Sequence, residues 1–305
     1  MEIRNVALLG AGAIGCWFIA GLAEVPDLQL CLIADGARKQ RLEQNGVEIN
    51  GRHYSLPVRS AEAAAGADLL IVALKYGALR PCLPAIAAAA GPHTTVLCAM
   101  NGVDSEEIVG ERIGPERVLP CLLKVSSERK GSSVKFNPEV GQGLLFGEAD
   151  GSVTERVLAL QALMERAGMH YMVRDNILQD IWFKYALNIS RNLPQAILNC
   201  PFRAYGASAH VAYISEKLRE EVIAVADARG IDLHAQDSPA GTNSPVSPEA
   251  RFSTLQDLDA GRETEIEMFS GTLIRMGRAA GVPTPWNEFA YHAIKALEEK
   301  NAGLF

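Results

Sequence analysis

The sequence lacks the patterns that mark metal sites and disulfide frameworks. Its six cysteines include no CxxC pair, and most of them lie in apolar runs. Its six histidines form no HxH or HxxxH pair. Free thiols buried in apolar surroundings are typical of proteins from a reducing compartment. We therefore expect a cytoplasmic protein with no metal site.

The chain also lacks an excess of basic residues and an uninterrupted hydrophobic span. Its formal net charge of −7 removes any general attraction to nucleic acid or to anionic membranes. Residues 6–23 carry no charge, but Gly10, Gly12, Gly15 and Gly21 interrupt them. A strand followed by a buried helix explains this stretch better than a secretory or membrane segment. We expect neither nucleic acid nor membrane as a partner.

A chain of 305 residues, 48% hydrophobic and 21% charged, has the length of two globular domains. Its first half alternates short β-rich runs with helical stretches, which is typical of a parallel sheet. These runs lack polar alternation, as strands covered by helices on both faces do. The expected strands are residues 6–9, 28–34, 69–74, 95–99, 118–125 and 144–146. We predict an α/β Rossmann domain over residues 1–173, with a doubly wound, mostly parallel sheet.

The second half has a different character. Long helical patterns occupy residues 177–192, 211–229, 264–280 and 287–300. Residues 235–249 instead contain prolines and glycines among Ser, Thr and Asn, a composition that resists regular structure. We predict an all-α domain over residues 174–305, interrupted by this loop.

A glycine-rich motif follows the first expected strand and opens an apolar helix. Its glycines have the GxGxxG spacing, which allows a tight turn, close approach of the backbone to a pyrophosphate, and close packing of helix on strand. The helix N-terminus favours the anion. A purely structural glycine turn is the alternative, but strand, motif, helix and second strand occur in order. We predict that NAD(P)H is bound by Gly10, Ala11, Gly12, Ala13, Ile14 and Gly15.

Asp35 stands at the end of the second expected strand, about 20 residues past the motif. A carboxylate there accepts hydrogen bonds from the adenosine ribose hydroxyls and repels a 2′-phosphate. Arg38 and Lys39 follow closely and would be able to neutralise such a phosphate. The alternative is that Asp35 only caps the next helix. We expect NADH to be favoured over NADPH.

Lys184, Asn188 and Asn192 are spaced four residues apart and share one face of an expected helix. An ammonium can protonate a developing alkoxide, and neighbouring amides can orient a polar substrate. The same spacing would also suit a solvated helix face. The apolar residues around Lys184 argue against full exposure, and spacing alone leaves both interpretations open.

The chain resembles the ketopantoate reductases (2-dehydropantoate 2-reductases) over nearly its whole length. The matching stretches follow one another in order. They are residues 10–15, 74–75, 101–102, 182–192, 196–197, 199–201, 253–257 and 264–266. The resemblance implies that a hydride passes from the nicotinamide to the C2 carbonyl of 2-dehydropantoate, yielding pantoate for pantothenate and coenzyme A biosynthesis.

The resemblance also implies roles for individual residues. Lys184 matches the family's proton-donating lysine, and Glu265 matches the glutamate that binds the substrate hydroxyl and holds the lysine in place. Asn188, Asn192 and Ser253 match residues that contact the carboxylate and hydroxyl groups of the substrate. Without the resemblance, Glu265 would be taken for part of an acidic helix surface.

Two further residues are implied by the resemblance. Lys75 and Asn101 match positions beside the nicotinamide. The resemblance implies a small 2-oxo acid as the substrate. Members of the family occur as monomers and as dimers, and we expect a homodimer here. We expect bound ligand to lie between the domains, where clefts usually form.

The sequence departs from the family pattern at three places. Tyr76 and its successors replace a glutamine that follows the Leu-Lys pair, Asp35 stands where many members have a phosphate-binding arginine, and Phe202 replaces a substrate-binding asparagine. The alternatives are a paralogous reductase of another small 2-oxo acid and a sensor that binds the dinucleotide without chemistry. An opine or 3-hydroxyacid dehydrogenase would normally use a catalytic histidine, and none lies in residues 177–192.

Overall fold

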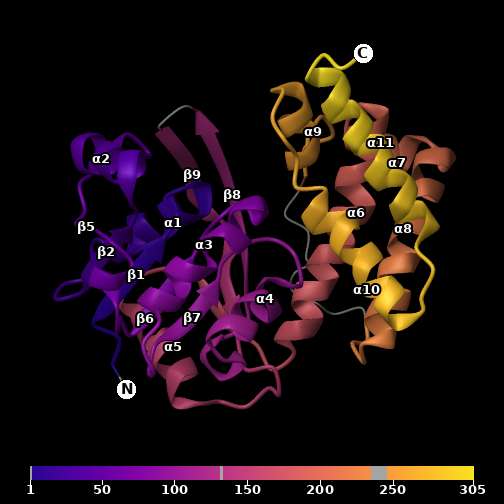
Figure 1. Ribbon diagram of the computed structural model, residues 1–305. Coiled ribbons are helices and arrows are strands. Elements are labelled where there is room, and N and C mark those ends of the chain that lie inside the picture. The colour runs from indigo at the N-terminus through magenta and orange to yellow at the C-terminus, as the bar shows by residue number, and fades with distance from the viewer. Residues whose placement is uncertain (1, 131–132, 235–245) are drawn as a thin grey trace. The chain divides into compact units, whose positions relative to one another are not determined.

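The computed structural model describes residues 2–130, 133–234 and 246–305. The chain divides into two compact units, Met1–Ile177 and Leu178–Phe305. The first is α/β and the second is helical, which confirms the predicted fold class (Figure 1). The functional boundary expected after residue 173 stays a prediction.

A five-stranded parallel sheet forms the centre of the first unit. Its order is β5-β2-β1-β6-β7, with β1 in the middle. The chain leaves β1 toward β2 and later returns to β6 on the opposite side, so the strand order reverses at β1. Ligands of such sheets bind at the carboxyl ends of the strands at this switch point. The strands are β1 (Asn5–Leu9), β2 (Gln29–Ile33), β5 (Val58–Arg59), β6 (Leu69–Val72) and β7 (Thr95–Cys98).

Both faces of this sheet are covered, which explains the unbroken apolar runs. Alternate residues of β1 belong to two cores, Leu8 packing with α1 and α5 and Ala7 packing with α3 and α4. Ala7 and Leu8 are both fully buried. The helices of this unit are α1 (Ala13–Leu22), α2 (Gly36–Asn45), α3 (Tyr76–Ala89), α4 (Ser105–Ile113) and α5 (Glu155–Arg166), with short 3-10 turns at Glu62–Ala64 and Pro115–Arg117.

A second, mixed sheet was not expected from the sequence. Strand β9, whose last three residues were predicted as a strand, pairs in parallel with β10, which was not predicted, and β8 runs antiparallel to β9. The predicted strand 118–125 overlaps β8, which lies in this second sheet, and Val118 just before it forms a bridge with Val96 of the parallel sheet. The strands are β3 (Val47–Ile49), β4 (Arg52–Tyr54), β8 (Cys121–Lys130), β9 (Ser133–Phe146) and β10 (Tyr171–Val173).

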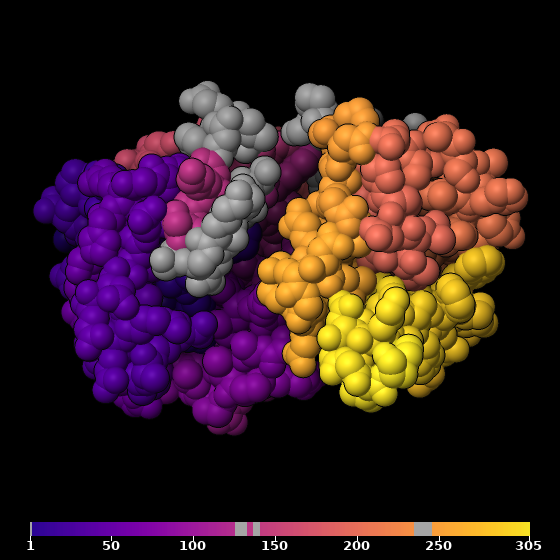
Figure 2. Space-filling view, turned by 90° about the horizontal axis from the view of Figure 1, so that it is seen from above, coloured from indigo at the N-terminus to yellow at the C-terminus, as the bar shows by residue number. Residues whose placement is uncertain are grey.

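The second unit is built on α6, which continues through Pro194 for 22 residues. Segments 250–280 and α11 lie side by side on the face shown in Figure 2. The predicted helix 264–280 begins later, at residue 267, and its first turn is a π-helix, η4, that leads into α10. The loop predicted at 235–249 falls largely outside the described residues. The helices are α6 (Ile177–Leu198), α7 (Ala204–Ala207), α8 (Ala209–Ala228), α9 (Ser253–Asp259), η4 (Glu267–Gly271), α10 (Thr272–Ala280) and α11 (Pro285–Asn301).

Candidate active site

The glycine motif forms a turn at the carboxyl end of β1. Gly10 has φ +108°, and a Cβ there would lie 2.3 Å from the Ala73 carbonyl oxygen at the end of β6. A Cβ at Gly15 would lie 1.9 Å from the Gly10 carbonyl oxygen. The chain therefore requires glycine at both positions, one for the backbone conformation and one for close packing of α1 on the turn.

Gly12 is needed for a different reason from Gly10 and Gly15. A Cβ at Gly12 would meet no atom within 4 Å, so packing of the protein does not explain the glycine. Gly12 is the N-cap of α1 and provides no side-chain capping bond to the first amides of the helix. An open turn with free space and helix N–H groups is the environment that a pyrophosphate needs. Residues Gly10 to Gly15 thus fit a dinucleotide.

Asp35 lies at the end of β2 and is exposed. It occupies the N-cap position of α2, yet its side chain makes no capping hydrogen bond. The capping alternative therefore has no bond to support it. Of the two cations that follow, Lys39 lies 3.9 Å from Glu43, one turn along the same helix.

Lys75 and Asn101 follow neighbouring parallel strands, β6 and β7, and so lie at the same edge of the sheet as the glycine turn. Lys75 is the exposed N-cap of α3, and Asn101 is half-buried. The Tyr76 hydroxyl donates a 2.6 Å hydrogen bond to Asp104 Oδ2 and ties the two loops together. Tyr76 is one of the departures from the family pattern, and Asp104, three residues after Asn101, belongs to no motif in the sequence.

The predicted polar face of α6 is not a solvated surface. Lys184 and Asn188 are half-buried, and Asn192 is 7% exposed. Asn192 Nδ2 lies 3.4 Å from the Oγ atom of Ser253, and Ser253 is the first residue of α9. This contact brings together two residues that are 61 positions apart and that were predicted to bind the same substrate.

Glu265 lies just before η4 and is half-buried, so it is not part of an exposed acidic helix surface. The segment before it is held by α11, because Glu298 Oε1 accepts 2.7 Å hydrogen bonds from the Thr264 backbone N–H and hydroxyl. Although burial acts to raise the pKa of Glu298, hydrogen bonds from Lys295 and Thr264 hold it below its ordinary value. An ionised Glu298 thus keeps the Glu265 segment in place.

Tyr185 connects the Lys184 helix with the segment after Glu265. Its buried hydroxyl donates to the Phe269 carbonyl at 2.6 Å and lies 3.3 Å from the Met268 carbonyl. Both carbonyls belong to η4, and π-helical turns are frequent at functional sites. Because Tyr185 follows Lys184 directly, this bond fixes the turn of α6 that carries the lysine. Neither Tyr185 nor Glu298 belongs to a spacing pattern that would have predicted these roles.

Within residues 2–130, 133–234 and 246–305, no three His, Cys, Asp or Glu side chains are arranged to hold a metal ion. In the same described ranges, no helix combines the length and the hydrophobicity needed to span a bilayer.

Comparison with known proteins gives consistent matches along both units. Residues 6–151 match the family model "Ketopantoate reductase PanE/ApbA", and residues 176–298 match its C-terminal counterpart. A 2-dehydropantoate 2-reductase from Mesorhizobium japonicum is 29% identical, over 96% of this chain and 97% of that protein.

Solved structures agree in fold. A PanE/ApbA family ketopantoate reductase from Ralstonia eutropha JMP134 superposes with a TM-score of 0.82 at 26% identity, covering 98% of this chain and 99% of that one. A D-mandelate dehydrogenase, solved with NADH and anilino(oxo)acetate, gives a TM-score of 0.80 at 22% identity, with coverages of 98% and 99%. The second likeness shows the shared fold alone.

Proposed function

Because this chain belongs to the ketopantoate reductase family and is an oxidoreductase acting on a CH–OH group, we propose that it reduces 2-dehydropantoate to pantoate with NAD(P)H. The observation that most directly supports a small 2-oxo acid is the contact between Asn192 and Ser253. An amide and a hydroxyl held together on two helices suit the carboxylate and hydroxyl groups of such a substrate.

The cofactor supplies the hydride when it is bound, and the turn at Gly10 to Gly15 would hold its pyrophosphate. Lys75 and Asn101 lie at the same sheet edge and would flank its nicotinamide. Asp35 would accept hydrogen bonds from the adenosine ribose, and we propose that it favours NADH over NADPH. The exposed carboxylate without a capping bond supports this assignment.

Lys184 would donate the proton that the carbonyl oxygen needs as it becomes a hydroxyl group. A half-buried ammonium is suited to this step, because a partly desolvated cation stabilises a developing alkoxide better than one in bulk water. Asn188, Asn192 and Ser253 would orient the substrate. Glu265 would bind the substrate's hydroxyl, and the bonds of Tyr185 and Glu298 would hold the two segments in place.

The test is the absorbance at 340 nm of purified protein with 2-dehydropantoate and either NADH or NADPH. Rapid oxidation of one cofactor would establish the activity and decide the role of Asp35. No oxidation with 2-dehydropantoate would lead to a panel of other 2-oxo acids. No oxidation across that panel would favour the dinucleotide sensor instead.

A paralogous reductase of a more apolar 2-oxo acid is the second candidate, and one observation favours it. The Phe202 ring, which replaces the family's asparagine, packs edge-on against Phe252 with ring centroids 5.7 Å apart. Phe252 directly precedes Ser253, and the Arg191 guanidinium lies 5.7 Å from the Phe202 ring centroid. Two rings beside the proposed carboxylate site would favour a branched or aromatic side chain. The same panel measures kcat/KM for each acid.

A homodimer stays a prediction. Light scattering on the eluting chromatographic peak would measure the mass directly.

A further inference from the structure

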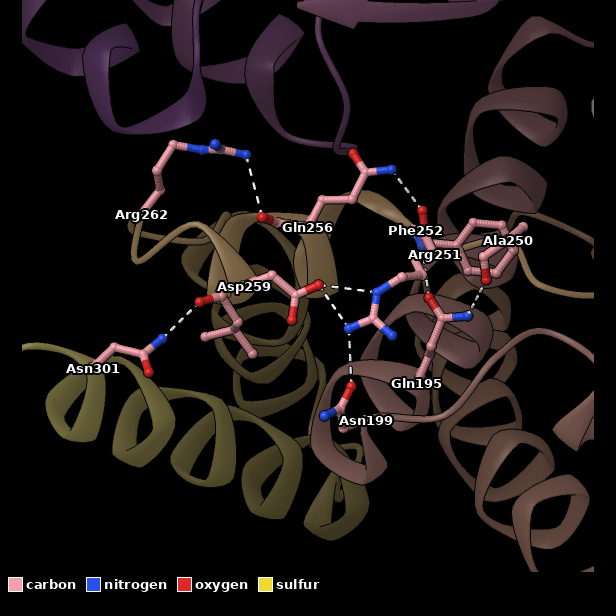
Figure 3. Close-up of polar contacts among 10 residues, drawn as sticks. Gln195, Asn199, Ala250, Arg251, Phe252, Gln256, Asp259, Arg262 and Asn301 are labelled. Atoms are coloured by element: carbon pink, nitrogen blue, oxygen red, sulfur yellow. Dashed lines mark hydrogen bonds and ion pairs between the residues drawn. The ribbon is translucent and has the colours of Figure 1, made fainter. Parts of the chain in front are cut away.

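The short segment before α9 has no regular secondary structure, although it leads directly into Ser253. One buried side chain from α6 holds its backbone. Gln195 Nε2 donates to the Ala250 carbonyl at 2.8 Å, and Gln195 Oε1 accepts from the Phe252 N–H at 2.6 Å (Figure 3). The glutamine amide thus pairs with this segment as a neighbouring β-strand would, through one donor and one acceptor.

Gln195 has no exposed surface. The glutamine end of both bonds is therefore shielded from water, while their backbone partners, Ala250 and Phe252, are half-buried, and replacing Gln195 would take from each of these groups the bond that it now has. The cost of such a loss exceeds the net gain from a typical exposed hydrogen bond.

The other side-chain hydrogen bonds of Arg251 and Gln256 in this segment are exposed, while the Phe252 ring packs against Phe202. Arg251 donates to Asp259 Oδ2 at 2.6 and 2.9 Å and to Asn199 Oδ1 at 2.9 Å, and Gln256 donates to the Arg251 carbonyl at 2.6 Å (Figure 3). Exposed ion pairs contribute little to stability because water and salt screen them. Gln195 therefore makes the larger contribution to the position of the segment.

Gln195 lies close in sequence to Asn192, one of the two residues proposed to contact the substrate here. It lies three positions after Asn192, one turn farther along α6. The same stretch of helix therefore holds the backbone at Phe252 and contacts the next residue, Ser253. Any shift of the segment would change the distance between Asn192 and Ser253.

We infer that Gln195 is a positioning residue that fixes Ser253 beside Asn192 and so sets the affinity for the 2-oxo acid. This inference rests on the proposed function. It assigns to Gln195 no contact with the substrate and no part in the transfer of the hydride or the proton.

The test replaces Gln195 by methionine, which keeps the length of the side chain and removes both hydrogen bonds. We expect KM for the 2-oxo acid to rise about tenfold, as a loss of substrate positioning would produce, with kcat changed about twofold or less. The dissociation constant of the cofactor should not change. Gln179→Met is the matched control, because Gln179 lies on the same helix and bonds the Asp232 carbonyl instead.

A double-mutant cycle separates positioning from a merely structural effect. If Gln195 acts through Ser253, Gln195→Met combined with Ser253→Ala will raise KM no more than Ser253→Ala alone. Additive effects would overturn the inference, and so would an unchanged KM in Gln195→Met.

A second variant covers the case in which the methionine protein does not fold. Gln195→Glu keeps the acceptor for the Phe252 N–H but, when ionised, cannot donate to the Ala250 carbonyl. Its KM relative to the wild type should rise with pH as the introduced carboxyl loses its proton. A KM ratio independent of pH and equal to one would contradict the inference.

Hydrogen exchange of the Phe252 amide, measured on the same proteins, does not depend on activity. We expect faster exchange in Gln195→Met than in the wild type and in Gln179→Met. If the wild type reduces no 2-oxo acid with either cofactor, the proposed function is wrong. Unchanged protection of the Phe252 amide in Gln195→Met would show that Gln195 does not hold this segment, whether or not the protein is active.

Discussion

Replacing Glu106 with glutamine should make the protein more stable above neutral pH. Glu106 lies in the first turn of α4, just after the Asn101 loop. Part of the residue is exposed, but its carboxyl group is enclosed, and burial raises its pKa from 4.5 to about 7. The negative charge of Asp104 acts in the same direction, while a 2.8 Å hydrogen bond from the Ser105 hydroxyl opposes it.

The direction in which stability changes with pH follows from whether the folded or the unfolded state binds the proton of Glu106. Between pH 4.5 and 7 the folded protein keeps a proton on Glu106 that the unfolded chain releases, so rising pH favours unfolding. At ~1.36 kcal/mol for each pKa unit, this carboxyl should remove about 2–3 kcal/mol of stability between pH 5 and pH 8. Above pH 8 both states are ionised and the effect is constant. A glutamine at this position binds no proton and has no such dependence.

The assay is the free energy of unfolding in urea from pH 5 to pH 8, for the wild type and Glu106→Gln. The difference between the two proteins cancels the titration of all other groups. It should grow with pH in favour of the variant. Glu111→Gln is the control, because Glu111 is exposed on the same helix and its replacement removes the same charge. Parallel curves for wild type and Glu106→Gln would refute the reasoning.

Three further replacements test the site. Lys184→Ala should lower kcat by roughly 10² to 10⁴ without changing cofactor affinity, because only proton donation is lost; near-normal turnover would refute its role. Asp35→Arg should shift the ratio of kcat/KM toward NADPH, whereas an unchanged ratio would deny Asp35 a part in cofactor choice. Tyr185→Phe removes the buried bond to Phe269 and should lower the melting midpoint by about 4–10 °C, while Tyr213→Phe, at an exposed tyrosine, should leave the midpoint unchanged.

The local features of the first unit could be predicted because each has a short-range physical cause. The GxGxxG spacing encodes a turn that only glycine can adopt, as Gly10 shows with its positive φ and its approach to Ala73. The unbroken apolar strand at Leu69–Val72 reflects burial on both faces of a parallel sheet. Both signals lie within about ten residues of sequence.

The second sheet and η4 could not be predicted in the same way. Strand β8 has an apolar start that suits either sheet, and its pairing with β9 depends on which strand lies beside it rather than on its own pattern. At η4 the apolar spacing from Met268 to Ile274 is that of an ordinary helix. One extra residue in the turn changes which backbone carbonyls are bonded, and one carbonyl of this turn, that of Phe269, accepts a hydrogen bond from Tyr185, 84 positions away in the sequence.

The residues that position the site are hidden from sequence patterns for a related reason. Gln195 bonds to backbone groups, which every residue offers, and Glu298 bonds to Thr264, 34 positions away, through both its backbone and its hydroxyl, so no local spacing marks these bonds in the sequence. Asn192 and Ser253 could be named because they match a family motif, and motifs record the groups that meet the substrate. The side chain of Gln195 bonds to the backbone of Ala250 and Phe252. If the cycle between Gln195 and Ser253 is not additive, substrate affinity in this chain is set partly by a residue that no substrate-contact motif would identify.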